Sequence, residues 1–142
     1  MKKINRFIGD YSVFSNFYSS PIWDDGIEYP TVEHYFQAMK TLDPNQRRTI
    51  SMAATPGAAK RMGRRVKLRE DWEQVKERYM LFALRQKFSS GDCKKALLAT
   101  GNIYLEEGNS WGDTYWGVCN GVGKNRLGYL LMQVREELRS VS

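Results

Sequence analysis

The stretch IWDDGIEYPTVEHYFQAMK, residues 22–40, carries the two local signals from which we predict the fold. Its first part, residues 22–29, has short apolar runs separated by the triplet DDG at residues 24–26, which is typical of a tight hairpin turn. Pro30 and Thr31 follow, and a threonine just before an apolar periodic run is a favourable helix N-cap. A strand pair followed directly by a helix favours an α+β protein over an alternating βαβ one.

We predict that this helix runs from Thr31 to about Leu42. Its apolar positions keep one face inward: Val32, Tyr35, Phe36 and Met39. The opposite stripe is polar: Glu33, Gln37 and Lys40. Glu33 lies two residues after the cap, where the helix dipole favours an ionised carboxylate and so suits a base, a nucleophile or a cation stabiliser. Acidic residues also stabilise helix starts without any catalytic role, and position alone favours that simpler interpretation.

The rest of the chain adds more helices and a few short strands. Two helix starts pair an N-cap residue with proline: Asp43–Pro44 and Thr55–Pro56. Three further helices are predicted over residues 71–88, 92–100 and 124–140, and a short strand-like run covers residues 3–8. Residues 102–123 are rich in glycine and aromatics, which is typical of loops with one or two short strands. We therefore predict one compact α+β domain over residues 1–142, predominantly helical with a small sheet.

Composition excludes several classes of protein. The hydrophobic fraction is 42% and the charged fraction 27%, ordinary values for a soluble globular chain. No run approaches the roughly 20 apolar residues of a membrane span, and the N-terminus lacks a secretion signal, so we expect a cytoplasmic protein without a membrane partner. The cysteines Cys93 and Cys119 lack metal or disulfide spacing, and His34 is the sole histidine. We expect no metal and no cofactor, reduced cysteines, and a structural role for His34.

Positive charge is concentrated in one part of the chain. Residues 43–95 hold 14 Lys/Arg against 6 Asp/Glu, a balance of +8, whereas the whole chain has a net charge of +6. The densest part is KRMGRRVKLR, residues 60–69, with six bases and no acid. Two interpretations stay open: a solvated face, or a surface that attracts the phosphates of a nucleotide or nucleic acid.

Motifs for common enzyme chemistries are missing. No GxGxxG or GxxxxGK[ST] is present, and the sole histidine lies beside Glu33 in the sequence, which argues against a Ser-His-Asp triad. Carboxylates are the remaining acid–base groups. WGDTYWG, residues 111–117, sets Asp113 between two tryptophans on a glycine-flanked segment, which suits either stacking on a planar ligand or a core position. Asn125 and Arg126 open the last helix, where N–H donors and a cation suit phosphate.

Two long segments resemble a known family. FSNFYSSPIWDDGIEYPTVEHYFQAMK, residues 14–40, and WGDTYWGVCNGVGKNRLGYLLMQVR, residues 111–135, are similar to the NADAR superfamily, also called the YbiA-like family of N-glycosidases. The resemblance implies a compact α+β fold and cleavage of a ribose C1′–N bond. It implies a phosphorylated ribosyl or ADP-ribosyl small molecule as substrate: either a ribosylamino intermediate of the riboflavin pathway or ADP-ribose joined to a nucleobase.

The same resemblance implies roles for individual residues. Glu33 is the expected catalytic carboxylate, and Asp113 is a weaker candidate for a second acid–base group or a ribose-hydroxyl acceptor. The other expected pocket positions are Phe14, Asn16, Phe17, Gln37, Lys40, Trp72, Trp111, Gly112 and Trp116. Asn125 and Arg126 are expected to meet phosphate, and residues 60–69 are a candidate contact for ADP-ribosylated nucleic acid. Two alternatives remain: a module that binds ADP-ribose or a nucleotide without hydrolysis, and a structural or phage-accessory protein.

Overall fold

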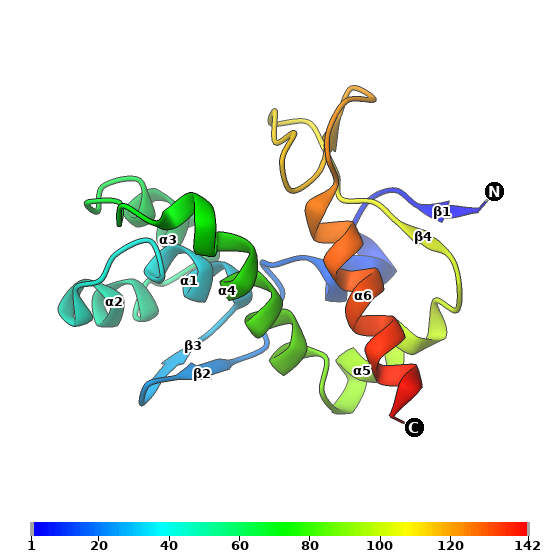
Figure 1. Ribbon diagram of the computed structural model, residues 1–142, viewed down its shortest axis with the longest axis horizontal. Coiled ribbons are helices and arrows are strands. Elements are labelled where there is room, and N and C mark those ends of the chain that lie inside the picture. Colours follow the sequence, from blue (N-terminus) through cyan, green and yellow to red (C-terminus); the bar gives the residue numbers. More distant parts are fainter. Residues whose placement is uncertain (1, 142) are drawn as a thin grey trace. The chain divides into compact units, whose positions relative to one another are not determined.

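The computed structural model describes residues 2–141, and Figure 1 shows its elements. The chain divides into two compact units. One is Asn16–Lys87, and the other combines the segment up to Ser15 with the chain from Phe88 onward. The sequence shows no linker at either junction, so this division was not predicted, and the single domain over residues 1–142 stays a prediction.

The unit Asn16–Lys87 contains one hairpin and four helices. Its elements are β2 (Ile22–Asp24), β3 (Ile27–Tyr29), α1 (Val32–Ala38), α2 (Pro44–Ser51), α3 (Pro56–Gly63) and α4 (Trp72–Lys87). The two strands pair antiparallel, with Asp24 opposite Ile27. Between them, Asp25 and Gly26 have φ of 51° and 76°, the left-handed backbone of a two-residue hairpin turn. The predicted hairpin is therefore confirmed.

Helix α1 is the centre of this unit, packed against α2, α3 and α4 (Figure 1). All seven of its residues are buried, so Glu33 and Gln37, which were expected on the face opposite the core, are buried as well. The Tyr35 hydroxyl donates to Asp24 of the hairpin at 2.9 Å. Burial, and then this carboxylate, raises the pKa of Tyr35. The helix thus joins the hairpin to the helical layer.

The predicted end of this helix at Leu42 is wrong, because α1 ends at Ala38. Its Thr31 cap is confirmed, since the Thr31 side chain accepts from the backbone N–H of His34. Just beyond the end, the backbone N–H of Arg69 donates to the Lys40 carbonyl at 2.9 Å. This contact is with a residue far along the chain, so helical periodicity gives no sign of it.

The other helix starts of this unit follow the sequence signals. The Asp43 side chain accepts from Asn45 N–H at 2.9 Å at the start of α2. The Thr55 hydroxyl accepts from Ala58 N–H at 3.0 Å at the start of α3. Both starts carry proline at the first helical position, as predicted. The long helix α4 begins directly after Asp71 and ends where predicted to within one residue.

The described part of the other unit contains two α-helices, one 3₁₀ helix and short paired strands. Its elements are β1 (Lys3–Ile4), the 3₁₀ helix η1 (Gly9–Phe14), α5 (Gly91–Ala99), β4 (Tyr104–Leu105), β5 (Gly108–Asn109), β6 (Val118–Cys119) and α6 (Arg126–Ser140). Strand β1 pairs parallel with β4, and β5 pairs parallel with β6. Helix α6 buries an apolar stripe: Leu127, Leu130, Leu131 and Val134. Cys93 is buried, Cys119 is partly exposed, and both are free thiols.

Together these elements make an α+β fold in which helices predominate, as predicted. Within residues 2–141 the strands form three separate two-stranded sheets and not one small sheet. The strand expected over residues 3–8 is limited to Lys3–Ile4. No helix within residues 2–141 combines the length and the apolar character needed to cross a bilayer.

Candidate functional site

Glu33 lies in the first turn of α1, and its side chain is buried, with the residue 8% exposed. The Gln37 amide Nε2 donates to Glu33 Oε2 at 2.6 Å. The backbone N–H of Glu33 donates to the Asn16 carbonyl at 3.0 Å. A carboxylate that accepts a side-chain N–H near a helix start is stabilised in its ionised form. The helix start and the segment before the hairpin thus hold Glu33 in place together.

Lys40 supplies positive charge close to this carboxylate. Burial lowers the pKa of Lys40, Glu33 acts in the opposite direction, and Arg64 and Lys60 lower the pKa further. The Lys40 ammonium lies 5.9 Å from the centre of the Phe36 ring. Lys40 is thus a cation near Glu33 whose pKa depends on burial and on the neighbouring charges.

Two aromatic residues expected at the site have different surroundings within this unit. Trp72 is buried, and its ring packs against Phe36 with the ring centres 5.0 Å apart. The Lys40 ammonium lies over the Phe36 ring. Trp72 therefore packs against the aromatic ring that contacts this cation. Phe17 is 48% exposed. Of the two, Phe17 is better suited to stacking on a ligand.

Two acceptor atoms at this site have no hydrogen-bond partner among residues 2–141: Asn16 Oδ1 and Gln37 Oε1. The Asn16 amide Nδ2 lies 3.7 Å from Met80 Sδ, a weak contact. Buried polar atoms are almost always paired, so each unpaired acceptor calls for an explanation.

His34 has the structural role expected of it. Its Nε2 lies 3.0 Å from the Ala53 carbonyl, and its Nδ1 lies 2.8 Å from the Thr31 hydroxyl. A carbonyl only accepts, so Nε2 carries the proton and Nδ1 accepts from the hydroxyl. Within residues 2–141 no three His, Cys, Asp or Glu side chains gather as a metal site would require.

The remaining candidate residues lie in the other unit. Phe14 is 1% exposed and belongs to an aromatic core with Phe7, Tyr11 and Phe88. That packing gives Phe14 a core role and leaves its ring little surface for a nucleobase. Trp111 is 63% exposed, and Gly112 next to it has φ of 87°, a conformation that favours glycine.

Asp113 braces the loop that carries these residues. Its Oδ1 accepts from the backbone N–H of Tyr115 at 3.1 Å and of Trp116 at 2.9 Å. Its own N–H donates to Asn109 Oδ1 at 3.0 Å. One carboxylate oxygen therefore shapes the loop, which is a local structural role for a residue expected to act in chemistry.

A phosphate site is expected at the start of α6. The backbone N–H groups of Asn125, Arg126 and Leu127 donate to the carbonyls of the 115–117 loop, at 3.3, 3.1 and 3.0 Å. The Asn125 side chain is also satisfied internally, because its amide donates to the Leu105 carbonyl and its oxygen accepts from Glu107 N–H. These backbone amides therefore already donate to loop carbonyls, and the expectation that Asn125 and Arg126 bind a substrate phosphate stays a prediction. The Arg126 guanidinium lies 5.9 Å from the centre of the Tyr129 ring.

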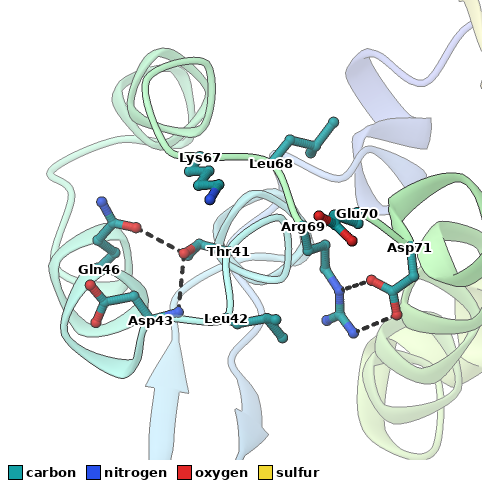
Figure 2. Close-up of a pocket in the computed structure, with 9 residues that line it drawn as sticks. All are labelled: Thr41, Leu42, Asp43, Gln46, Lys67, Leu68, Arg69, Glu70 and Asp71. Atoms are coloured by element: carbon teal, nitrogen blue, oxygen red, sulfur yellow. Dashed lines mark hydrogen bonds and ion pairs between the residues drawn. The ribbon is translucent and has the colours of Figure 1, made fainter.

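A pocket of about 700 Å³ lies beyond the end of α1. Figure 2 shows its lining: Thr41, Leu42, Asp43, Gln46, Lys67, Leu68, Arg69, Glu70 and Asp71. Arg69 faces Asp71 across two hydrogen bonds of 2.6 and 3.0 Å, and Thr41 donates to Gln46 at 2.8 Å. Glu33 is not part of this lining, and two of its charges, Arg69 and Asp71, are paired with one another. We therefore place the candidate site at Glu33 and not in this pocket.

The model of the NADAR domain matches residues 5–139, nearly the whole chain and both units. The chain belongs to the NADAR family. N-glycosidase YbiA of Shigella flexneri is 52% identical over 133 residues, covering 91% of this chain and 82% of that protein. A Vibrio vulnificus riboflavin biosynthesis protein is 36% identical over 134 residues, covering 92% of this chain and 36% of that protein. The NMR structure of E. coli YbiA superposes with a TM-score of 0.87 at 47% identity, covering 99% of this chain and 86% of that chain.

The NADAR motif residues are divided between the two units. Six lie in the unit Asn16–Lys87: Asn16, Phe17, Glu33, Gln37, Lys40 and Trp72. The others lie in the second unit: Phe14, Trp111, Gly112, Asp113, Trp116, Asn125 and Arg126.

Sequence reasoning missed two contributors to this NADAR site, both on or next to α3. Lys60 acts on the pKa of Lys40, and Gly63 lies against the Gln37 side chain. The sequence offered one signal for Gly63. A glycine within a helix often has a packing reason, such as the close approach of another element. Lys60 was visible only as part of the basic run 60–69. That run does not act as one surface, because Arg69 is bound to Asp71 and Tyr79.

Proposed function

We propose that this chain hydrolyses the C1′–N bond of a phosphorylated ribosylamino or ADP-ribosyl substrate, with Glu33 as the catalytic carboxylate. At the level of enzyme class the chain is an N-glycosyl hydrolase, as its close similarity to N-glycosidase YbiA indicates. Its substrate class is a ribosyl-type small molecule. The observation that carries the role of Glu33 is its buried carboxylate, held by an amide donor at 2.6 Å.

The chemistry explains why a fixed carboxylate is needed. Cleavage of a glycosidic bond passes through an oxocarbenium-like sugar, which an anion next to C1′ stabilises. The same carboxylate orients or deprotonates the attacking water. The hydrogen bond from Gln37 favours the ionised form of Glu33, which both roles require. This sequence of steps needs only side chains of the chain and water.

Positive charge near Glu33 suits a phosphorylated substrate. Lys60 and Arg64 each act electrostatically on Lys40 and lower its pKa, so three cations share this part of the unit. In our proposal Lys40 meets a phosphate or the developing charge of the leaving group, and Arg64 adds to the attraction. The exposed ring of Phe17 stacks on the departing base.

The second unit contributes weaker candidates to this proposal. The exposed Trp111 ring suits stacking, and the Arg126 guanidinium suits phosphate. Asp113 is retained as an acceptor for a ribose hydroxyl, with the oxygen that does not brace the loop. Its role as a second acid–base group is the least supported part of the proposal.

Two substrates fit the proposal: a ribosylamino intermediate of the riboflavin pathway and ADP-ribosylated guanine in a nucleic acid. The Vibrio vulnificus relative is named for riboflavin biosynthesis, which points to a ribosylamino intermediate of that pathway. The excess of bases over residues 43–95 points to a larger anion such as ADP-ribosylated guanine in a nucleic acid. Salt separates them, because activity on a nucleic acid falls more steeply with ionic strength than activity on a free nucleotide.

The decisive test compares wild type with Glu33→Gln on a substrate panel, with products identified by mass spectrometry. The panel contains riboflavin-pathway ribosylamino phosphates, ADP-ribosylated guanosine and an ADP-ribosylated oligonucleotide. We expect Glu33→Gln to lose 100-fold or more in rate while calorimetry shows retained binding, an order of magnitude typical of a lost general base. Glu28→Gln on strand β3, an exposed glutamate, is the matched control and should keep wild-type activity.

Two outcomes would contradict the proposal. Wild-type activity in Glu33→Gln would remove Glu33 from the chemistry. Tight binding of ADP-ribose by the wild type, with no base or ribose phosphate released from any substrate, would instead favour a module that binds without hydrolysis.

A further inference from the structure

Gly63, the last residue of α3, lies directly against the side chain of Gln37 on α1. A Cβ atom built on Gly63 would lie 1.9 Å from Gln37 Oε1 and 2.8 Å from Gln37 Cδ. Both distances are far below van der Waals contact, so no other amino acid fits without displacing the amide. Gly63 has ordinary helical geometry within α3, so close approach, and not backbone freedom, is what requires glycine here.

The same geometry describes a weak hydrogen bond. A Cα–Cβ bond is about 1.5 Å long, so the Gly63 Cα lies within about 3.4 Å of Gln37 Oε1, the range of Cα–H···O contacts. Gln37 Oε1 is otherwise without a hydrogen-bond partner among residues 2–141. The Gly63 Cα–H therefore accounts for this buried acceptor.

This contact decides which way the Gln37 amide points. With Oε1 against Gly63, the Nε2 donor faces Glu33 and makes the 2.6 Å hydrogen bond. Turning the amide by 180° would aim Oε1 at a carboxylate oxygen and aim the NH₂ donors at a C–H group. The contact between the two oxygens would be repulsive, and the NH₂ donors would have no acceptor. Unpaired buried polar groups lower stability.

We propose that Gly63 is a positioning residue that acts through Gln37 on the Glu33 carboxylate. The absence of a side chain at Gly63 leaves room for the Gln37 amide, and its Cα–H holds the amide in the orientation that donates to Glu33. The proposal rests on the catalytic role of Glu33 proposed above. It makes α3, which has no acidic group of its own, part of what holds the reacting carboxylate.

Helix α3 also fixes where Gly63 lies. The Thr55 cap and the proline after it set the start of the helix, and Gly63 falls two turns after Pro56. Ala59, one turn before Gly63, is fully buried, so small residues form the closely packed face of this helix. The close approach at Gly63 is thus built into the register of a well-capped helix.

The test is Gly63→Ala, with Gly57→Ala on the same helix as the matched control. At Gly57 an added Cβ meets only ordinary contacts of 3.7 and 3.8 Å, so its activity should stay at the wild-type level. In Gly63→Ala the methyl group displaces the amide and Glu33 loses a charged hydrogen bond. We expect kcat to fall on the order of 10- to 100-fold, with KM changed by less than about threefold.

A coupling measurement separates positioning from a general packing defect. Gln37→Ala should lower kcat by a similar factor, because it removes the same donor. In the Gln37→Ala background, Gly63→Ala should then lower kcat no further, since there is no amide left to displace. A further tenfold loss in the double variant would overturn the proposal, as would wild-type kcat in either single variant.

Stability measurements keep the test decisive if Gly63→Ala folds poorly. Removing the Gln37 amide removes the two shortest contacts of the new methyl group and leaves only the Cβ of residue 37, at 3.0 Å. The double variant should therefore fold and should melt close to the temperature of Gln37→Ala. A double variant that still fails to fold would show that Gly63 is required by something other than Gln37 and would overturn the proposal.

The outcome with Glu33→Gln tells the two proposals apart. If Glu33→Gln keeps wild-type activity, the catalytic assignment fails and the role of Gly63 fails with it. If Glu33→Gln is inactive but Gly63→Ala and Gly57→Ala are equally active, the assignment of Glu33 stands and the positioning role of Gly63 alone is wrong.

Discussion

Thr31→Val should destabilise the protein much more than a normal loss of a helix cap. The Thr31 hydroxyl accepts from His34 N–H at 3.1 Å and lies 2.8 Å from His34 Nδ1, and Thr31 is only 3% exposed. Since Nε2 of this imidazole donates to the Ala53 carbonyl, the hydroxyl is the donor to Nδ1. Valine has nearly the same shape and suits the extended backbone at this position, with φ of −143° and ψ of 165°.

The magnitude follows from these two bonds. Loss of an N-cap costs about 1 kcal/mol, and an unpaired buried acceptor costs about 1–3 kcal/mol more. We therefore expect the free energy of unfolding to fall by about 2–4 kcal/mol. Thr55→Val is the matched control, because the exposed Thr55 hydroxyl accepts only the cap bond from Ala58 at 3.0 Å. Its expected cost is about 1 kcal/mol.

Urea unfolding followed by circular dichroism measures both values under the same conditions. The slopes with denaturant should be unchanged, so that differences in midpoint report stability. Thr31→Ser, which keeps the hydroxyl, should lie close to wild type. If Thr31→Val and Thr55→Val differed by less than about 0.5 kcal/mol, the double role of the Thr31 hydroxyl would be refuted.

Two further predictions concern charge. Burial lowers the pKa of Lys40, and Arg64 lowers this pKa further. Arg64→Gln should therefore raise the pKa of Lys40 and move the basic limb of the pH–rate profile to higher pH. The neighbouring Arg65→Gln should leave the basic limb unchanged. Arg69→Ala should cost about 2–3 kcal/mol in urea unfolding, because its side chain is only 8% exposed and donates to several groups. Asp71→Asn should cost much less, since its side chain is 50% exposed, and equal losses would contradict this.

Local signals in the sequence predicted the elements that depend on local chemistry. The turn at Asp25 and Gly26 was predictable because few residues adopt left-handed backbone at adjacent positions. The caps at Asp43 and Thr55 were predictable because each is followed by proline. The catalytic candidate Glu33 came from motif resemblance, since its position in the first helical turn fits a structural role equally well.

Contacts between distant parts of the chain could not be predicted in this way. Just beyond the end of α1, the Lys40 carbonyl accepts from the backbone N–H of Arg69. The amides at the start of α6 are occupied by a loop whose carbonyls point at them, which no helix-start signal reveals. The contact between Gly63 and Gln37 requires the packing of α1 on α3. Each of these is a close approach decided by tertiary structure.

The burial of α1 on all sides is itself an argument for function. A seven-residue helix that buries Glu33 and Gln37 among apolar neighbours loses the hydration of both side chains. A helix optimised only for stability would place apolar residues there, because a half-satisfied buried polar group is worse than an apolar one. Instead Gln37 leaves its carbonyl oxygen with only a C–H contact in order to donate to Glu33. Local losses of this kind are expected where a fold holds a reactive group in a required state.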